Sequence, residues 1–213
     1  MARKRKHAPL YYLRRRQFAQ RTLWLLLVVF ALVQVGYFLT VSVSEPALTT
    51  PAADRKRYDD RIFKVVQVID GDTLDIDVAD GSKSSTRIRL WGVDTPEVGG
   101  AGQQAMYYGA QASAFAREKL AGQTVRILLE PQQETRGRYG RLLAYVYLPD
   151  GAMFNEMLLV GGYAYADPRF KHVYRERFTQ LEKQARRQEA GLWQHARFED
   201  YPVWLQRRIG SNR

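Results

Sequence analysis

Three short runs of the sequence combine acidic and basic side chains of the kinds that hydrolyse phosphate esters. They are Asp70-Gly71-Asp72-Thr73, Asp94-Thr95-Pro96-Glu97 and Gly137-Arg138-Tyr139-Gly140-Arg141. Each run alone has an ordinary explanation, because Asp-Gly pairs and prolines favour turns, and glycine-containing loops often carry solvated arginines. Together they hold the parts that phosphodiester hydrolysis needs: ligands for a cation, a group that orients water, and positive charge for the transition state.

Two carboxylates and one backbone carbonyl in the first two runs form a candidate metal site. Asp72, Asp94 and the carbonyl oxygen of Thr95 are hard oxygen ligands, which suit Ca²⁺ and leave positions for water and a phosphate oxygen. The chain contains no cysteine, which excludes thiolate metal sites, thiol nucleophiles and disulfides. We therefore expect Ca²⁺ as the cofactor.

The other charged residues of this set can divide the catalytic work. Glu97 follows Asp94 by three residues and could hold or deprotonate the attacking water. Arg89 and Arg141 offer planar, permanently charged groups that can bind phosphate oxygens through paired hydrogen bonds. The sequence therefore predicts a metal-dependent phosphodiesterase with Arg89, Glu97 and Arg141 as its catalytic residues.

Five short strands are expected to position these residues. Residues 73–78 alternate apolar Leu74, Ile76 and Val78 with acidic side chains, which is the periodicity of a half-buried strand. The other strand-like runs are residues 63–68, 87–93, 125–129 and 142–147. Asp-Gly turns at 70–71 and 80–81 connect the first three runs into a meander.

Three helical segments are expected at about residues 105–120, 152–159 and 173–189. The third is amphipathic, because Tyr174, Phe178, Leu181 and Ala185 recur at helical spacing. A meander with so few intervening helices favours a closed barrel over a parallel βαβ sheet, which needs a helix after nearly every strand. The predicted fold class is a β-barrel with helices (α+β): a five-stranded OB-fold barrel, named for oligonucleotide binding, with three helices.

Between about Phe63 and Trp193 the chain resembles the staphylococcal nuclease (thermonuclease) family. The motifs are VIDGDT at 68–73, RLWGVDTPE at 89–97, YGAQASAF at 108–115, YGRLLAYVY at 139–147 and GLW at 191–193. The resemblance implies a calcium-dependent endonuclease that cuts the P–O5′ bond of DNA and RNA and leaves 3′-phosphates. It implies calcium ligation by Asp72, Asp94 and Thr95, and catalysis by Arg89, Glu97 and Arg141.

Tyr139, in the YGR motif, is the nucleotide contact that the resemblance implies, and base stacking on a tyrosine is tolerant of sequence. The family usually has an acidic residue shortly before YGR, where this chain has Gly137.

The alternative function is a non-catalytic OB module that binds nucleic acid or protein. Such a module is expected to lose some metal or arginine positions, and this chain retains all of them. A phosphodiesterase for other phosphate esters, the preference for DNA or RNA, and endo or exo cleavage all remain open.

The net charge of +11 is concentrated at the N-terminus. Eight Lys and Arg residues and no acid precede residue 22, which leaves +3 for the rest, so net charge is not an argument for nucleic-acid binding. Residues 23–43 are uncharged and long enough to span a bilayer, and the positive-inside rule places the N-terminus in the cytoplasm. We expect a single-pass membrane protein whose nuclease domain is periplasmic or extracellular, or a secreted protein if the segment is a cleaved signal peptide.

The predicted organisation has five parts. They are a basic cytoplasmic arm (1–22), a transmembrane signal anchor (23–43), a linker (44–60), the nuclease-like domain (61–195) and a C-terminal tail (196–213). The linker is expected to be irregular and solvated, because it holds Pro46, Pro51 and a charged run without periodicity. The expected partners are DNA or RNA and the membrane, with no obligate protein partner.

Overall fold

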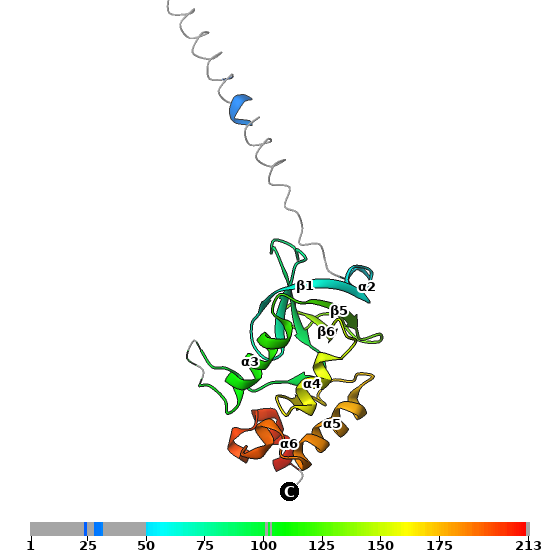
Figure 1. Ribbon diagram of the computed structural model, residues 1–213. Coiled ribbons are helices and arrows are strands. Elements are labelled where there is room, and N and C mark those ends of the chain that lie inside the picture. The colour runs from blue at the N-terminus through cyan, green and yellow to red at the C-terminus, as the bar shows by residue number, and fades with distance from the viewer. Residues whose placement is uncertain (1–23, 25–27, 32–49, 101, 103, 212–213) are drawn as a thin grey trace, which may run out of the picture. The chain divides into compact units, whose positions relative to one another are not determined.

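The computed structural model describes residues 24, 28–31, 50–100, 102 and 104–211 (Figure 1). The chain divides into two compact units, Met1–Ala47 and Leu48–Arg213. Residues 24 and 28–31 of the first unit are helical, and most of the predicted membrane span, 23–43, lies outside the described residues. Within the described part of the chain, no helix is both long and apolar enough to cross a bilayer.

Five strands of the second unit close into a barrel in the order β1-β2-β3-β6-β5. Their bounds are Arg61–Val68 (β1), Thr73–Ile76 (β2), Thr86–Leu90 (β3), Thr124–Leu129 (β5) and Leu142–Tyr147 (β6). Neighbouring strands pair antiparallel, except that β3 and β6 are parallel. The predicted five-stranded barrel is confirmed.

Alternation along the strands fills the barrel with branched aliphatic side chains. In β3, Ile88 and Leu90 are buried while Arg87 and Arg89 project from the opposite face. Leu74 and Ile76 of β2 and Ile127 of β5 belong to the same core, and each is at most 1% exposed. The alternation in β3 thus places Arg87 and Arg89 on the face that points away from the barrel interior.

Three helices accompany the barrel at the positions predicted: α3 (Gly109–Leu120), α4 (Phe154–Val160) and α5 (Arg175–Arg187). On α5, Phe178 and Ala185 are buried, as the amphipathic pattern predicts. Two short strands, β4 (Val93–Asp94) and β7 (Tyr165–Ala166), form a separate antiparallel pair that the sequence analysis does not anticipate. This pair holds the start of the Asp94-Thr95-Pro96-Glu97 run beside the segment that follows α4.

The predicted linker differs from the structure, which forms helix α2 (Pro51–Tyr58) inside residues 44–60. Thr50 caps the helix by accepting a hydrogen bond from the Ala53 N–H, and Pro51 stands at its first turn. Asp54 is 2% exposed and Tyr58 is fully buried. Residues 51–58 are therefore part of the folded unit, and they do not form a solvated spacer.

The predicted C-terminal tail is also ordered over most of its length. After the 3₁₀ turn η1 (Gly191–Gln194), the chain forms a second turn, η2 (Phe198–Asp200), and helix α6 (Val203–Gly210). Leu205 of α6 is 8% exposed and packs in a small cluster with buried Tyr165 and Leu192. The segment beyond residue 195 is thus attached to the body of the fold.

Candidate active site

The pairing of β2 with β3 places Asp72 next to Arg89. Thr73 lies opposite Arg89 in the ladder, and the Leu90 N–H donates to the Asp72 carbonyl at 2.9 Å. Asp72 stands at the turn end of β2, where it is 6% exposed. The barrel strands therefore fix the first acid and the first arginine of the predicted site.

Close approach of two backbone segments brings Thr95 against Asp72. A Cβ at Gly71 would lie 2.7 Å from Thr95 Oγ1, so only glycine leaves room for this contact. Asp72 Oδ2 accepts hydrogen bonds from the Thr95 N–H at 2.8 Å and from Thr95 Oγ1 at 3.0 Å. Thr73 Oγ1 donates to Asp72 Oδ1 at 3.1 Å. Gly71 is therefore required by the close approach of Thr95 as well as by the turn that it helps to form.

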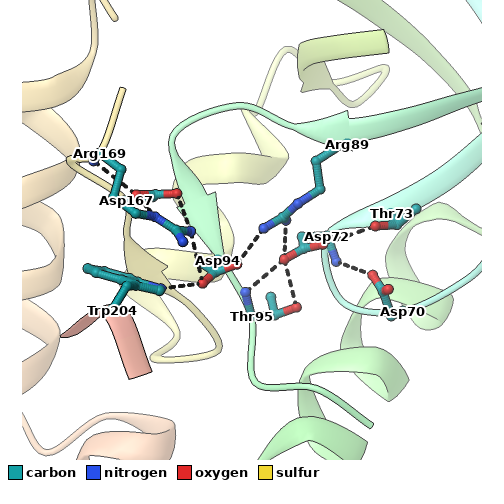
Figure 2. A network of polar contacts seen from close by, with 9 residues as sticks. All are labelled: Asp70, Asp72, Thr73, Arg89, Asp94, Thr95, Asp167, Arg169 and Trp204. Atoms are coloured by element: carbon teal, nitrogen blue, oxygen red, sulfur yellow. Dashed lines mark hydrogen bonds and ion pairs between the residues drawn. The ribbon is translucent and has the colours of Figure 1, made fainter. Parts of the chain in front are cut away.

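Arg89 lies between the two predicted metal-binding carboxylates (Figure 2). Its guanidinium forms an ion pair with Asp72 through Nη1 and donates to Asp94 Oδ1 through Nη2 at 2.5 Å. Burial disfavours its charged form, but Asp72 and Asp94 outweigh this effect and raise the pKa of Arg89 above its ordinary value. The buried guanidinium of Arg89 therefore links both carboxylates.

A single arginine does not offset the crowding of carboxylates around it. Burial, followed by repulsion from Asp72, raises the pKa of Asp70 to about 6. Burial also raises the pKa of Asp94 to about 6 against the attraction of Arg89, with repulsion from Asp72 adding to the increase. Asp70 and Asp94, which resist ionisation beside the carboxylate of Asp72, form an environment that a divalent cation would stabilise, so the donor set fits Ca²⁺.

The donors available to a cation are few. No group of three or more His, Cys, Asp or Glu side chains in the described residues is arranged to hold a metal ion. The predicted set has two carboxylates, Asp72 and Asp94, and the Thr95 carbonyl. Water and substrate oxygens would have to complete the coordination, which is the arrangement expected of a catalytic ion.

Glu97 lies at the solvent-exposed edge of this cluster. Partial burial and repulsion from Asp72 raise its pKa, while Arg89 and Arg141 oppose the increase. The backbone of Glu97 packs closely against the N-terminus of α3. A Cβ added to Gly109 would lie only 2.3 Å from the Glu97 carbonyl oxygen. No hydrogen bond or ion pair joins the Glu97 carboxylate to another described residue. This acid is therefore available to bind water.

Arg141 and Tyr139 stand together on the loop between β5 and β6. The Arg141 guanidinium lies 5.7 Å from the centroid of the Tyr139 ring, and the Tyr139 side chain is 67% exposed. Arg138 also lies over this ring, at 4.4 Å. Arg141 is near enough to Glu97 to affect its pKa, so the third run belongs to the same site as the first two.

The chain is similar in sequence to known nucleases. It is 41% identical over 137 residues to the thermonuclease of Staphylococcus hyicus, covering 63% of this chain and 76% of that one. It is 42% identical over 135 residues to the thermonuclease of Staphylococcus intermedius, covering 62% and 76%. An uncharacterized endonuclease of Escherichia coli O157:H7 is 35% identical over 149 residues, covering 68% and 83%.

A family model described as Staphylococcal nuclease homologue matches residues 87–195. The chain belongs to the staphylococcal nuclease family. It is therefore a nuclease, a hydrolase of phosphodiester bonds, as the three runs of charged residues predicted. The matched segment includes Arg89, Asp94, Glu97 and Arg141, and Asp72 lies just before it.

Two features of this nuclease site were missed by the sequence analysis. Arg136, just before the YGR motif, donates to Asp54 of α2 and to the Gly140 carbonyl, and so fixes the loop where the family usually has an acid. Trp204 of α6 donates to Asp94 from 110 positions away in the sequence. The capping signal at Thr50-Pro51 could have revealed α2, whereas no local pattern reports the contact of Trp204.

Proposed function

We propose that this protein is a Ca²⁺-dependent nuclease that cuts the P–O5′ bonds of DNA, RNA or both and leaves 3′-phosphates. The observation that carries the proposal is the largely buried cluster of Asp70, Asp72 and Asp94, in which Arg89 pairs with two of the three acids and Arg169 reaches only Asp94. Such a cluster is short of positive charge, and its oxygen donors suit a hard divalent cation. The family membership and the thermonuclease relatives support the same conclusion.

In this proposal the cation is held by Asp72, Asp94 and the Thr95 carbonyl. When bound, it would polarise a phosphoryl oxygen and compensate the negative charge that develops in the transition state. Asp72 is oriented by the Thr95 N–H and hydroxyl, so its position does not depend on the cation.

The remaining residues act on water and phosphate. Glu97 holds the attacking water and takes its proton, because its carboxylate is exposed and free of ion pairs among the described residues. Arg89 and Arg141 donate to the phosphate oxygens as negative charge accumulates there. The exposed ring of Tyr139 offers a surface on which a base can stack without selection for sequence.

The test is cleavage by the purified full-length chain in detergent. Single-stranded DNA and RNA oligonucleotides should be cut when Ca²⁺ is present and left intact with chelator, and the new ends should be 3′-phosphates. Glu97→Gln should lower the rate strongly, whereas Glu118→Gln, which changes an exposed acid on α3, should not. Equal cleavage in chelator, or 5′-phosphate products, would overturn the proposal.

We further propose that residues 23–43 tether the nuclease to a membrane with its active site outside the cytoplasm. This part of the proposal rests on sequence alone: an uncharged apolar run preceded by eight positive charges. Extracytoplasmic calcium would suit a site of two carboxylates and one carbonyl, because such sites bind Ca²⁺ weakly. Intact cells expressing the protein should degrade added DNA in the presence of Ca²⁺. Activity that appears only after lysis would argue against this topology.

A further inference from the structure

The carboxylate of Asp94 is held from two sides. Oδ1 faces Arg89 and the barrel, while Oδ2 accepts a hydrogen bond from Trp204 Nε1 at 2.6 Å. Arg169 also donates to Oδ2, at 3.3 Å. Figure 2 shows the indole of Trp204 and the side chain of Arg169 on the side of Asp94 opposite Arg89. Asp94 therefore has one oxygen occupied by the C-terminal part of the chain.

The indole that makes this bond is itself fixed in place. Its helix, α6, packs through Leu205 against Tyr165, which is the residue paired with Asp94 in the short ladder of β4 and β7. The guanidinium of Arg169 lies over the Trp204 ring at 4.6 Å. Arg169 in turn donates to both carboxylate oxygens of Asp167, at 2.8 and 2.7 Å. The Trp204 N–H is thus held on Oδ2 by the packing of α6 and by the cation–π contact with Arg169. Arg169 is itself fixed by its two hydrogen bonds to Asp167.

We propose that Trp204 is a positioning residue for Asp94 and thereby sets the affinity of the site for Ca²⁺. The inference rests on the proposed function, in which Asp94 is a calcium ligand. With Oδ2 committed to the indole, the side chain of Asp94 is oriented so that Oδ1 faces Arg89, which also pairs with Asp72. Partners that orient a ligating carboxylate typically change metal affinity by about 10- to 100-fold when they are removed.

A role in packing alone can be separated from this one because the chain provides a matched control. Trp193 belongs to the same cluster as Trp204, and its ring also lies beneath an arginine, Arg186, at 3.8 Å. However, the buried Nε1 of Trp193 has no hydrogen-bond partner among the described residues. Replacement of either tryptophan by phenylalanine keeps an aromatic ring and removes one N–H, and only the N–H of Trp204 contacts Asp94.

The experiment is calorimetric titration of the full-length chain in detergent with Ca²⁺ alone, without nucleic acid. Trp204→Phe should weaken binding by about tenfold or more, while Trp193→Phe should bind as the wild type does. Thermal unfolding without Ca²⁺ should be similar for the two variants. Equal dissociation constants for Trp204→Phe and Trp193→Phe would overturn the inference.

Asp94→Asn separates this failure from failure of the proposed function. If the wild type does not bind Ca²⁺, or if Asp94→Asn binds it as tightly as the wild type does, both the calcium site and the inference fail. Binding that is lost in Asp94→Asn yet intact in Trp204→Phe contradicts only the role of Trp204. If Trp204→Phe does not fold, the indole N–H resonance of Trp204 in the wild type provides the test. A shift of this signal on addition of Ca²⁺ supports the proposal, and an unchanged signal opposes it.

Discussion

Asp54 of α2 accepts two hydrogen bonds from Arg136, at 2.8 Å from Nε and 2.8 Å from Nη2, across 82 positions of the chain. Arg136 also reaches Asp80 at 2.6 Å and the Gly140 carbonyl at 3.0 Å. Hydrogen bonds from Arg136 to Asp54 and then to Asp80 raise the pKa of this guanidinium above its ordinary value. A helix that precedes the barrel therefore fixes the loop that carries Arg141.

Breaking this pair should both destabilise the protein and slow cleavage. In Asp54→Asn the guanidinium of Arg136 keeps Asp80 but loses its buried, doubly hydrogen-bonded counter-charge, which should lower the free energy of unfolding by about 2–4 kcal/mol. The rate of DNA cleavage should fall as well, because the loop with Arg141 is less well ordered. Urea denaturation and cleavage kinetics measure the two effects.

The ion pair between Asp60 and Arg126 is the matched control. The Asp60 side chain is 70% exposed and the Arg126 side chain 40%, so Asp60→Asn should change the free energy of unfolding by less than about 1 kcal/mol. Equal losses of stability for Asp54→Asn and Asp60→Asn would contradict the account of the buried pair.

Gly71 should not tolerate alanine, although its φ is not in the left-handed region. The added Cβ would lie 2.7 Å from Thr95 Oγ1, so Thr95 would have to move away from Asp72. We expect at least about a tenfold loss in cleavage rate from this displacement. Gly210→Ala is the control, since no atom lies within 4 Å of its ideal Cβ position. A Gly71→Ala enzyme with wild-type kinetics would show that the close approach is not required.

His172 should make the protein less stable in mild acid. The sequence analysis did not assign it a role, yet it is partly buried between Tyr145 and Phe178, with ring centroids at 6.3 and 5.3 Å. Burial lowers its pKa below the ordinary value of 6.5, so the unfolded chain binds the proton more readily than the folded one. The contribution of His172 to the free energy of unfolding should therefore decrease as the pH falls below about 6.5, whereas Asp70 and Asp94, whose pKa values are raised to about 6, contribute in the opposite direction.

Substitution of this histidine should weaken that pH dependence. His172→Gln removes the titrating ring. Its free energy of unfolding should therefore rise relative to that of the wild type as the pH is lowered from about 7 to about 5, the window around the ordinary histidine pKa. His195→Gln, at an exposed position, should follow the wild-type curve. An unchanged slope in His172→Gln would assign the acid sensitivity to other groups.

Residue alternation and turn residues were sufficient to predict the barrel. The strand over 73–78 and the helix over 173–189 have periodicities that burial explains directly, and the structure has β2 and α5 there. Helix α2 was missed because its face toward the barrel is formed by Asp54 and Tyr58 and has no apolar repeat. Asp54 joins it to the rest of the fold through a long-range pair with Arg136, so the cap at Thr50-Pro51 is its main local signal.

The residues of the site that belong to short motifs with evident chemistry were the ones that could be predicted. Asp94 and Glu97 share one strand exit, and the chemistry of their side chains suggested their roles. The contacts of Trp204 and Arg169 with Asp94 depend on how α6 and the segment after β7 return to the barrel. Such contacts follow from tertiary packing, so the residues after 195 were expected to be a surface tail.

The central claim is that Asp94 binds the catalytic Ca²⁺ while Glu97 acts on water, and one measurement separates these roles. It is the single-turnover rate of DNA cleavage as a function of Ca²⁺ concentration for the wild type, Glu97→Gln and Asp94→Asn. Glu97→Gln should lower the maximal rate by about 10²- to 10⁴-fold without moving the half-saturating Ca²⁺ concentration. Asp94→Asn should raise that concentration. Wild-type rates in both variants, or cleavage by the wild type in chelator, would contradict the claim.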